Sequence, residues 1–200
     1  MRLSNSTSVH VVVDNVGVGP VAAIAALQLA DWKWMLKVNL LGVIHGVPAF
    51  LPLLRKNSDG GHIVSTASVG GLAAMLNLGA YAVSKFRIVA LAESLAQELA
   101  AEQSPIGVSV LVPGTVRTNI ARSSCNRPAD LGARALVDVD LEDGPDLGIR
   151  WLDPDDVGSR VIDGMAAGEL YIVTHPAVWP VVEARHQAIA ATFEAQSAHL

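Results

Sequence analysis

Cysteine and charged residues are scarce in this sequence. Cys125 is the single cysteine, so no internal disulfide can form, and the cytoplasm is the expected location. Charged residues make up 16% of the chain, and the formal net charge is −5. This balance provides no basic stripe that would neutralise phosphates, so nucleic acid is not an expected partner. The six histidines do not cluster, and we expect no metal site.

Long uninterrupted apolar runs are also absent. The longest apolar stretch, Leu40–Leu54, contains His45, Pro48 and Pro52 and is shorter than the roughly 20 residues that cross a bilayer. The polar first ten residues lead only to the short apolar run Val11–Val13, which is too short for the apolar region of a signal peptide. We therefore expect no membrane span and no leader.

Apolar residues are abundant, at 51% of the 200 residues, which is enough to bury one substantial core. No internal repeat or low-complexity tract is present. We therefore predict a single domain over residues 1–200. Within this domain, we expect residues 122–146 to form a flexible loop.

Short β-branched runs alternate with longer segments of helical periodicity. The predicted strands, each a short apolar run bounded by turn residues, are His10–Val13, His62–Thr66, Val108–Val112 and Leu170–Val173. The predicted helices are Asp31–Leu54, Ala80–Glu102, one that begins at Asp153-Pro154 with Asp153 as N-cap, and one that begins at Thr174-His175-Pro176 and extends towards Ala195. This alternation predicts an α/β fold with a doubly wound parallel sheet.

Tyr81 and Lys85 are the first candidates for chemistry. They stand four residues apart at the start of a predicted helix, so both side chains emerge on one face. A neighbouring ammonium favours the phenolate, so we expect Lys85 to lower the pKa of Tyr81 and make it a usable acid or base. Such a pair standing alone is more often a solvated surface pair. Ser68, however, lies just past a predicted strand, where ligands bind in open α/β sheets.

With these residues the sequence resembles the short-chain dehydrogenase/reductase family. The motifs that carry the resemblance, in their proper order, are Asp14-Asn15-Val16-Gly17, Val38-Asn39-Leu40-Leu41-Gly42, Ser68, Tyr81 with Lys85, and Pro113-Gly114-Thr115-Val116-Arg117-Thr118. The first motif departs from the family pattern, with aspartate where asparagine is usual and valine where alanine is usual. Agreement across the whole set makes a chance match remote.

The resemblance implies a catalytic group of four residues. Tyr81 would exchange a proton with the substrate oxygen, and Ser68 would hydrogen-bond that same oxygen. Lys85 would assist Tyr81 and hold the nicotinamide ribose, and Asn39 would position a water beside the lysine. An asparagine that enters a helix can also simply satisfy backbone groups there.

The resemblance also implies NAD or NADP as cofactor. The implied cofactor-binding residues are Asn15, Gly17, Tyr81, Lys85, Pro113, Gly114, Val116 and Thr118. Pro113 and Gly114 would form the wall beside the nicotinamide, and Val116 and Thr118 would bind its carboxamide. On local grounds alone, Pro-Gly after a strand is an ordinary turn signal.

The family's Gly-x-x-x-Gly-x-Gly phosphate-binding segment has no match in the sequence. Gly17 and Gly19 follow a predicted strand, but Pro20 comes next and the third glycine is absent. We therefore expect a partial Rossmann-like sheet, the C-terminal two-thirds of the family's fold, with its first βαβ units missing.

Two functions from different classes follow. The first is an NAD(P)-dependent oxidoreductase that acts on an apolar alcohol or ketone covered by residues 122–146, and that forms a homo-oligomer. The second is a catalytically inactive remnant, an interaction protein that associates through the helices Leu40–Leu54 and Ala80–Glu102. The missing phosphate-binding segment favours the second, and the complete catalytic group favours the first.

Overall fold

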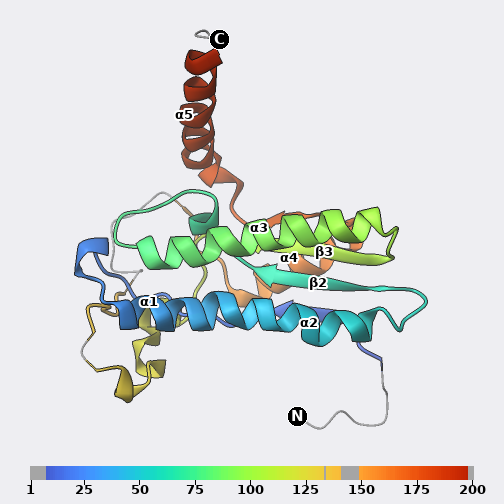
Figure 1. Cartoon of the computed structure of the whole chain (residues 1–200), viewed down its shortest axis with the longest axis horizontal. Coiled ribbons are helices and arrows are strands. Elements are labelled where there is room, and N and C mark those ends of the chain that lie inside the picture. Colours follow the sequence, from blue (N-terminus) through green and yellow to red (C-terminus); the bar gives the residue numbers. More distant parts are fainter. Residues whose placement is uncertain (1–7, 133, 141–148, 198–200) are drawn as a thin grey trace.

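The computed structural model describes residues 8–132, 134–140 and 149–197 and contains a parallel sheet of four strands (Figure 1). The strands are β1 (Val11–Asp14), β2 (Gly61–Thr66), β3 (Ile106–Val112) and β4 (Tyr171–Val173), and they lie in this order across the sheet. The register pairs Val12 with Ile63 and Ile63 with Val108. All four strands therefore end at the same edge.

Helices cover both faces of the sheet. The α-helices are α1 (Leu29–Leu36), α2 (Gly42–Leu54), α3 (Gly79–Ala101), α4 (Pro154–Ala167) and α5 (Trp179–Ser197). The shorter helices are η1 (Ile24–Ala26), the π-helix η2 (Lys37–Leu41), η3 (Val69–Gly71), η4 (Ile120–Asn126), η5 (Ala129–Leu131) and η6 (Pro176–Val178). The helices α1 to α3 lie on one side of the sheet and α4 on the other (Figure 1).

The two cores follow from the alternation of side chains along each strand. Ile63 packs under α2 and α3, whereas its neighbour Val64 packs under α4. In β3, Val110 faces the first core and Leu111 the second. A strand buried on both faces is mostly apolar on both, which is why these runs do not alternate regularly with polar residues, and the buried Ser109 in β3 donates a hydrogen bond to the Glu169 carbonyl. The predicted α/β, doubly wound parallel fold is confirmed.

Helix α2 continues from α1 through the π-helical turn η2, so Leu29–Leu54 forms one helical stretch. Pro48 and Pro52 lie inside α2 on its exposed side, where the carbonyl groups that lose a partner can face solvent. This stretch of 26 residues starts earlier than the apolar run seen in the sequence, and a window of 18 residues within it has a mean hydropathy of 1.4. By length and composition alone this stretch could cross a membrane. Core helices of globular proteins meet the same two criteria.

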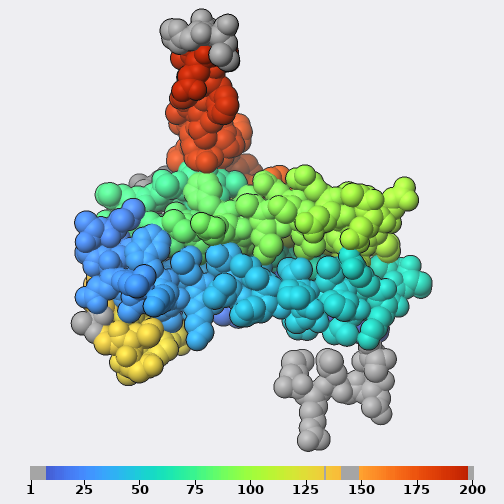
Figure 2. Space-filling view, in the orientation of Figure 1, coloured from blue at the N-terminus to red at the C-terminus, as the bar shows by residue number. Residues whose placement is uncertain are grey.

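The predicted start of α4 is confirmed, with Asp153 as N-cap, and the predicted start of the last helix needs correction. Pro154 occupies the first turn of α4 as predicted, but the Asp153 side chain makes no capping hydrogen bond, because it pairs with Arg117 at 3.1 Å. The last helix begins with the short turn η6, and α5 follows from Trp179. Helix α5 extends away from the sheet (Figures 1 and 2), and Val182 is its buried residue.

Candidate active site

The candidate residues gather at the carboxyl edge of the sheet. Asn15 follows β1, Ser68 follows β2 and Pro113 follows β3, while Tyr81 and Lys85 lie in the first two turns of α3. Ligands bind at this edge in open α/β sheets because the strand-to-helix turns leave a crevice there.

Tyr81 and Ser68 form the centre of the site. The Ser68 hydroxyl accepts a hydrogen bond from the backbone N–H of Gly70 at 3.1 Å, which fixes it at the N-terminus of η3. Burial raises the pKa of Tyr81, and a hydrogen bond with the Ser68 side chain opposes that rise. The expectation of a lowered pKa for Tyr81 is therefore wrong for this arrangement. Tyr81 keeps its proton at neutral pH and is suited to act as an acid.

Lys85 lies beside the Tyr81 ring and bonds to the end of β2. The Nζ atom donates a hydrogen bond to the carbonyl oxygen of Thr66 at 2.7 Å and lies 5.6 Å from the centre of the Tyr81 ring. The side chain is 2% exposed, and burial lowers the pKa of Lys85 to about 8.

Asn39 holds the turn after β1. Its side-chain oxygen accepts from the backbone N–H of Val18 at 2.8 Å, and its nitrogen donates to the Val18 carbonyl at 2.9 Å and to the Ser84 hydroxyl at 3.2 Å. The residue is fully buried in the π-helical turn η2. Asn39 thus satisfies backbone groups, as the structural interpretation of this residue predicts, and ties the turn to α3.

Gly17 lies where a side chain would close the site. A Cβ atom at this position would stand 3.6 Å from both Lys85 Nζ and Asn39 Oδ1. The Asn15 amide oxygen accepts a hydrogen bond from the Thr66 hydroxyl at 2.9 Å, so the turn after β1 is fixed to the end of β2. Asp14, which departs from the family pattern, packs against Gly46 of α2, and burial raises its pKa.

The Pro113-Gly114 turn is fixed by contacts on both sides. The Pro113 carbonyl accepts from the backbone N–H of Val69 at 2.9 Å, which links it to the Ser68 turn. The backbone N–H of Gly114 donates to His175 Nδ1 at 3.1 Å. Because a backbone N–H can only donate, His175 Nδ1 is an acceptor, and the protonated Nε2 donates to the Arg150 carbonyl at 2.9 Å.

Val116 and Thr118 line a cavity of about 290 Å³ next to this turn. Trp151, Arg117 and Arg122 also line it. The two residues that the resemblance assigns to the nicotinamide carboxamide therefore share one hollow. The space has room for a small planar ring, so the residues present fit the cofactor that the resemblance implies.

A folded-back segment closes one side of the site, and we call residues 120–132 and 134–140 the covering segment. Its backbone pairs with the turn after β1: Gly19 N–H donates to the Ile120 carbonyl at 3.0 Å, and Val21 and Val137 exchange two hydrogen bonds of 2.9 Å. A Cβ atom at Gly19 would stand 3.2 Å from Ile120 and 3.6 Å from the Tyr81 ring. Ile120 of the covering segment and the Tyr81 ring therefore both lie next to Gly19. Residues 141–146 of the predicted loop lie outside the described residues.

Comparison with known proteins decides the family. The sequence profile described as short chain dehydrogenase matches residues 3–128, more than half of the chain. The chain belongs to the short-chain dehydrogenase family. The resemblance carried by the sequence motifs is confirmed.

Two curated members of the short-chain dehydrogenase family show how much of the family's length this chain spans. It is 32% identical to the C alpha-dehydrogenase of Sphingobium sp. (strain NBRC 103272 / SYK-6) over 86% of this chain and 57% of the relative. It is 34% identical to a short-chain type dehydrogenase/reductase of Mycolicibacterium smegmatis over 82% of this chain and 60% of the relative. The chain thus spans about three-fifths of these relatives' length.

A solved short-chain dehydrogenase/reductase from Burkholderia phymatum, in complex with NAD, has the same fold. Its TM-score with this chain is 0.83 at 33% identity, over 92% of this chain and 68% of that one. This similarity extends past the catalytic motifs into the C-terminal elements, where the sequence resemblance rests mainly on the rhythm of strands and helices.

Three residues at the site were not singled out from the sequence: His175, Asp31 and Arg127. The sequence indicates His175 only as part of a helix start. It does not predict the hydrogen bond with Gly114, because the two residues are distant in sequence. Asp31 and Arg127 form an ion pair of 3.1 Å whose side chains are 0% and 3% exposed. No local pattern predicts such a pair, because each residue gains its role only when the covering segment folds back.

Proposed function

We propose that this chain carries the catalytic part of an NAD(P)-dependent oxidoreductase that transfers hydride between a nicotinamide and an alcohol or ketone. The observation that carries the proposal is the grouping of Ser68, Tyr81 and Lys85 at the carboxyl edge of the sheet, beside the open position at Gly17. Tyr81 and Lys85 are four residues apart on α3, whereas Ser68 comes from the turn after β2, so a contact through the fold joins the serine to the other two.

Each residue has a task that its contacts permit. A carbonyl oxygen held between Ser68 and Tyr81 would accept the Tyr81 proton while the carbonyl carbon gains a hydride, and the reverse transfers would oxidise the alcohol. Ser68 would donate to the same oxygen as negative charge develops on it. Lys85, whose Nζ atom is held by the hydrogen bond to the Thr66 carbonyl, would bind the ribose hydroxyls. A bound nicotinamide would supply or accept the hydride.

The cofactor, NAD or NADP, would be held by the turns that surround Gly17 and by the cavity beside the Pro113-Gly114 turn. The positions proposed to contact it are Asn15, Gly17, Tyr81, Lys85, Pro113, Gly114, Val116 and Thr118. Asn39 would act through the turn at Val18 by keeping Gly17 in place.

The proposed substrate is an apolar alcohol or ketone. Ile120, Leu131 and Leu136 bring apolar side chains towards Tyr81 from the covering segment. An apolar wall favours a hydrocarbon substituent on the carbonyl carbon, because its burial removes apolar surface from water. We also infer a cytoplasmic location, which an exposed free thiol at Cys125 supports.

A tyrosine exchange in the purified chain tests the proposal. Tryptophan fluorescence would first be titrated with NADH and NADPH, and reduction of acetophenone, an apolar aryl ketone, would then be followed. The Tyr81→Phe variant should lose about 10²- to 10⁴-fold in kcat, because it lacks the acid. Tyr171→Phe is the matched control, since Tyr171 is the other tyrosine and its hydroxyl bonds to Glu93 away from the site. Equal rates for parent and Tyr81→Phe would reject the mechanism.

The alternative function is an interaction protein without activity. Apolar residues on the outer side of the helical stretch Leu29–Leu54 favour it: Leu41 in η2 is 40% exposed and Phe50 in α2 is 39% exposed. Binding of neither NADH nor NADPH by a folded chain would support this alternative. Saturable binding with turnover would reject it, although a homo-oligomeric oxidoreductase would use the same helical face.

A further inference from the structure

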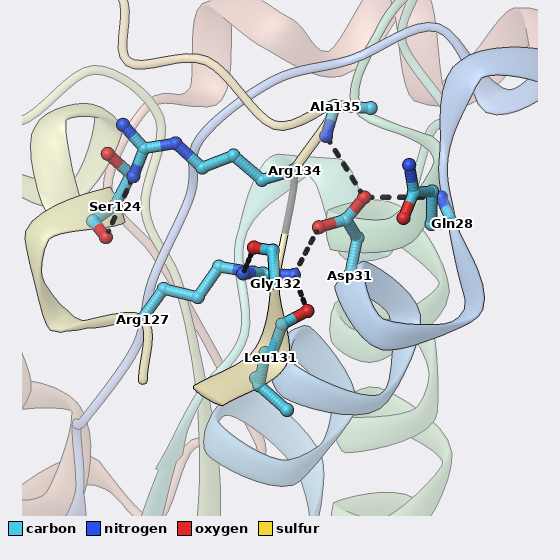
Figure 3. Close-up of polar contacts among 8 residues, drawn as sticks. All are labelled: Gln28, Asp31, Ser124, Arg127, Leu131, Gly132, Arg134 and Ala135. Carbon is cyan, nitrogen blue, oxygen red and sulfur yellow. Dashed lines mark hydrogen bonds and ion pairs between the residues drawn. The ribbon is translucent and has the colours of Figure 1, made fainter. Parts of the chain in front are cut away.

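A buried ion pair joins the covering segment to the start of α1, some distance along the sheet edge from the catalytic group. Arg127 Nη2 lies 3.1 Å from Asp31 Oδ1, and both side chains are almost fully withdrawn from solvent. Figure 3 shows the Arg127 guanidinium reaching across to Asp31 from the covering segment. Removing two charges from water is costly, so a pair in this position is poor evidence for stability and suggests a geometric role.

Both partners bind backbone on the two sides of the ion pair. Asp31 Oδ2 accepts from the backbone N–H of Ala135 at 3.2 Å and from that of Gln28 at 3.1 Å. Arg127 donates to the carbonyl oxygens of Gly132 at 2.9 Å and Leu131 at 3.3 Å (Figure 3). The carboxylate therefore links the first turn of α1 to the covering segment, and the guanidinium holds the bend within that segment.

The same bend presents apolar side chains to the catalytic tyrosine. Leu136, next to the anchored Ala135, is 1% exposed and belongs to the core cluster that includes Trp34 and Met35. Leu131 and Tyr81 pack against that cluster. The position of the segment relative to Tyr81 is thus fixed at one end by the Ile120 contact with Gly19 and at the other by the ion pair.

We propose that Asp31 and Arg127 are positioning residues for the reaction: their ion pair holds the covering segment against Tyr81 and so sets the affinity for the carbonyl substrate. This inference rests on the proposed function. Neither residue touches the reacting atoms, and both act through Leu131 and Leu136. Their loss should weaken substrate binding more than it slows the chemical step.

The test uses the full chain with Asp31→Asn, Arg127→Met and the double variant. Hydrogen–deuterium exchange would follow peptides from the covering segment and from residues 18–22, and steady-state kinetics would use acetophenone with the nicotinamide that binds. Arg127→Met should raise exchange in these peptides about tenfold while the rest of the sheet keeps its protection. The KM for acetophenone should rise about tenfold, with kcat changed by less than about threefold. The effect of the double variant should be smaller than the sum of the two single effects, because each single change already breaks the ion pair and also leaves one buried charge unpaired.

Arg55→Met is the matched control. Arg55 pairs with Glu102 at 2.6 Å, but these side chains are 48% and 52% exposed and lie far from the covering segment. This variant should leave exchange and KM unchanged. Unaltered exchange in Arg127→Met would show that the pair is no anchor. Faster exchange with an unchanged KM, or a fall in kcat alone, would overturn the role in substrate binding. A parent chain without turnover would overturn the proposed function and the substrate role, while exchange would still decide whether the pair anchors the segment.

Discussion

At the scale of single residues, burial controls the chemistry of this site more than charge proximity does. The sequence suggests that an ammonium four residues along the helix activates Tyr81. The folded chain withdraws both groups from water instead, which raises the pKa of Tyr81 and lowers that of Lys85. Both shifts favour the neutral forms, as expected for buried titratable groups.

Lys85 should therefore make stability depend on pH in the alkaline range. Its pKa is about 8 in the folded chain and 10.5 when unperturbed, so between these values the unfolded chain holds a proton that the folded chain has lost. The free energy of unfolding must then rise with pH across this window. Below pH 8 the folded chain buries a charged ammonium, so the full destabilising cost of that burial applies there. Relative to Lys85→Met, the parent should gain about 2 kcal/mol between pH 7 and 9.5 in urea unfolding.

The control for this prediction is Lys56→Met, which removes an exposed lysine at the end of α2. The comparison stops at pH 9.5 because the raised pKa of Tyr81 acts in the opposite direction above pH 10. A stability difference between parent and Lys85→Met that is constant with pH would contradict the lowered pKa of Lys85.

At the scale of elements, two glycines in helical segments should respond to the same substitution in opposite directions. A Cβ atom at Gly71 in η3 would stand 2.8 Å from the Lys85 carbonyl oxygen, so Gly71→Ala must push η3 away from α3 and should cost about 1–3 kcal/mol. Gly158 lies inside α4 with nothing within 4 Å of an added Cβ, so Gly158→Ala should stabilise by about 0.5–1 kcal/mol. Urea unfolding measures both. A Gly71→Ala variant as stable as the parent would contradict the packing of η3 against α3, and destabilisation by Gly158→Ala would contradict the open space at that position.

The elements themselves could largely be predicted from the sequence, because each strand is a short apolar run and each helix a longer periodic one. The carboxyl ends of the strands then place Ser68 and Pro113 at one edge without further information. The contacts that complete the site could not be predicted. The pairing of Val21 with Val137 and the bond from Gly114 to His175 join residues that are distant in sequence, and no local pattern carries them.

At the scale of the whole molecule, one broad helical face lacks cover among the described residues. The helices α1 to α3 lie side by side across this face (Figure 2), and 22% of the apolar window in Leu29–Leu54 is buried. Exposed apolar area of this extent in a helix layer is typical of a surface that another molecule covers. A second copy of the chain is the occupant that the proposed homo-oligomer requires.

A pair of charges placed on this face should therefore separate the copies. Leu41 and Ile44 lie three residues apart on one side of the helical stretch and are 40% and 37% exposed, so Leu41→Glu with Ile44→Glu should leave the fold intact and dissociate the assembly. Sedimentation should give at least twice 20.9 kDa for the parent and about that mass for the variant. Ile162→Glu, at a 64% exposed position on α4, is the control and should leave the mass unchanged. A parent that sediments as a single chain would show that α2 is not an interface between copies.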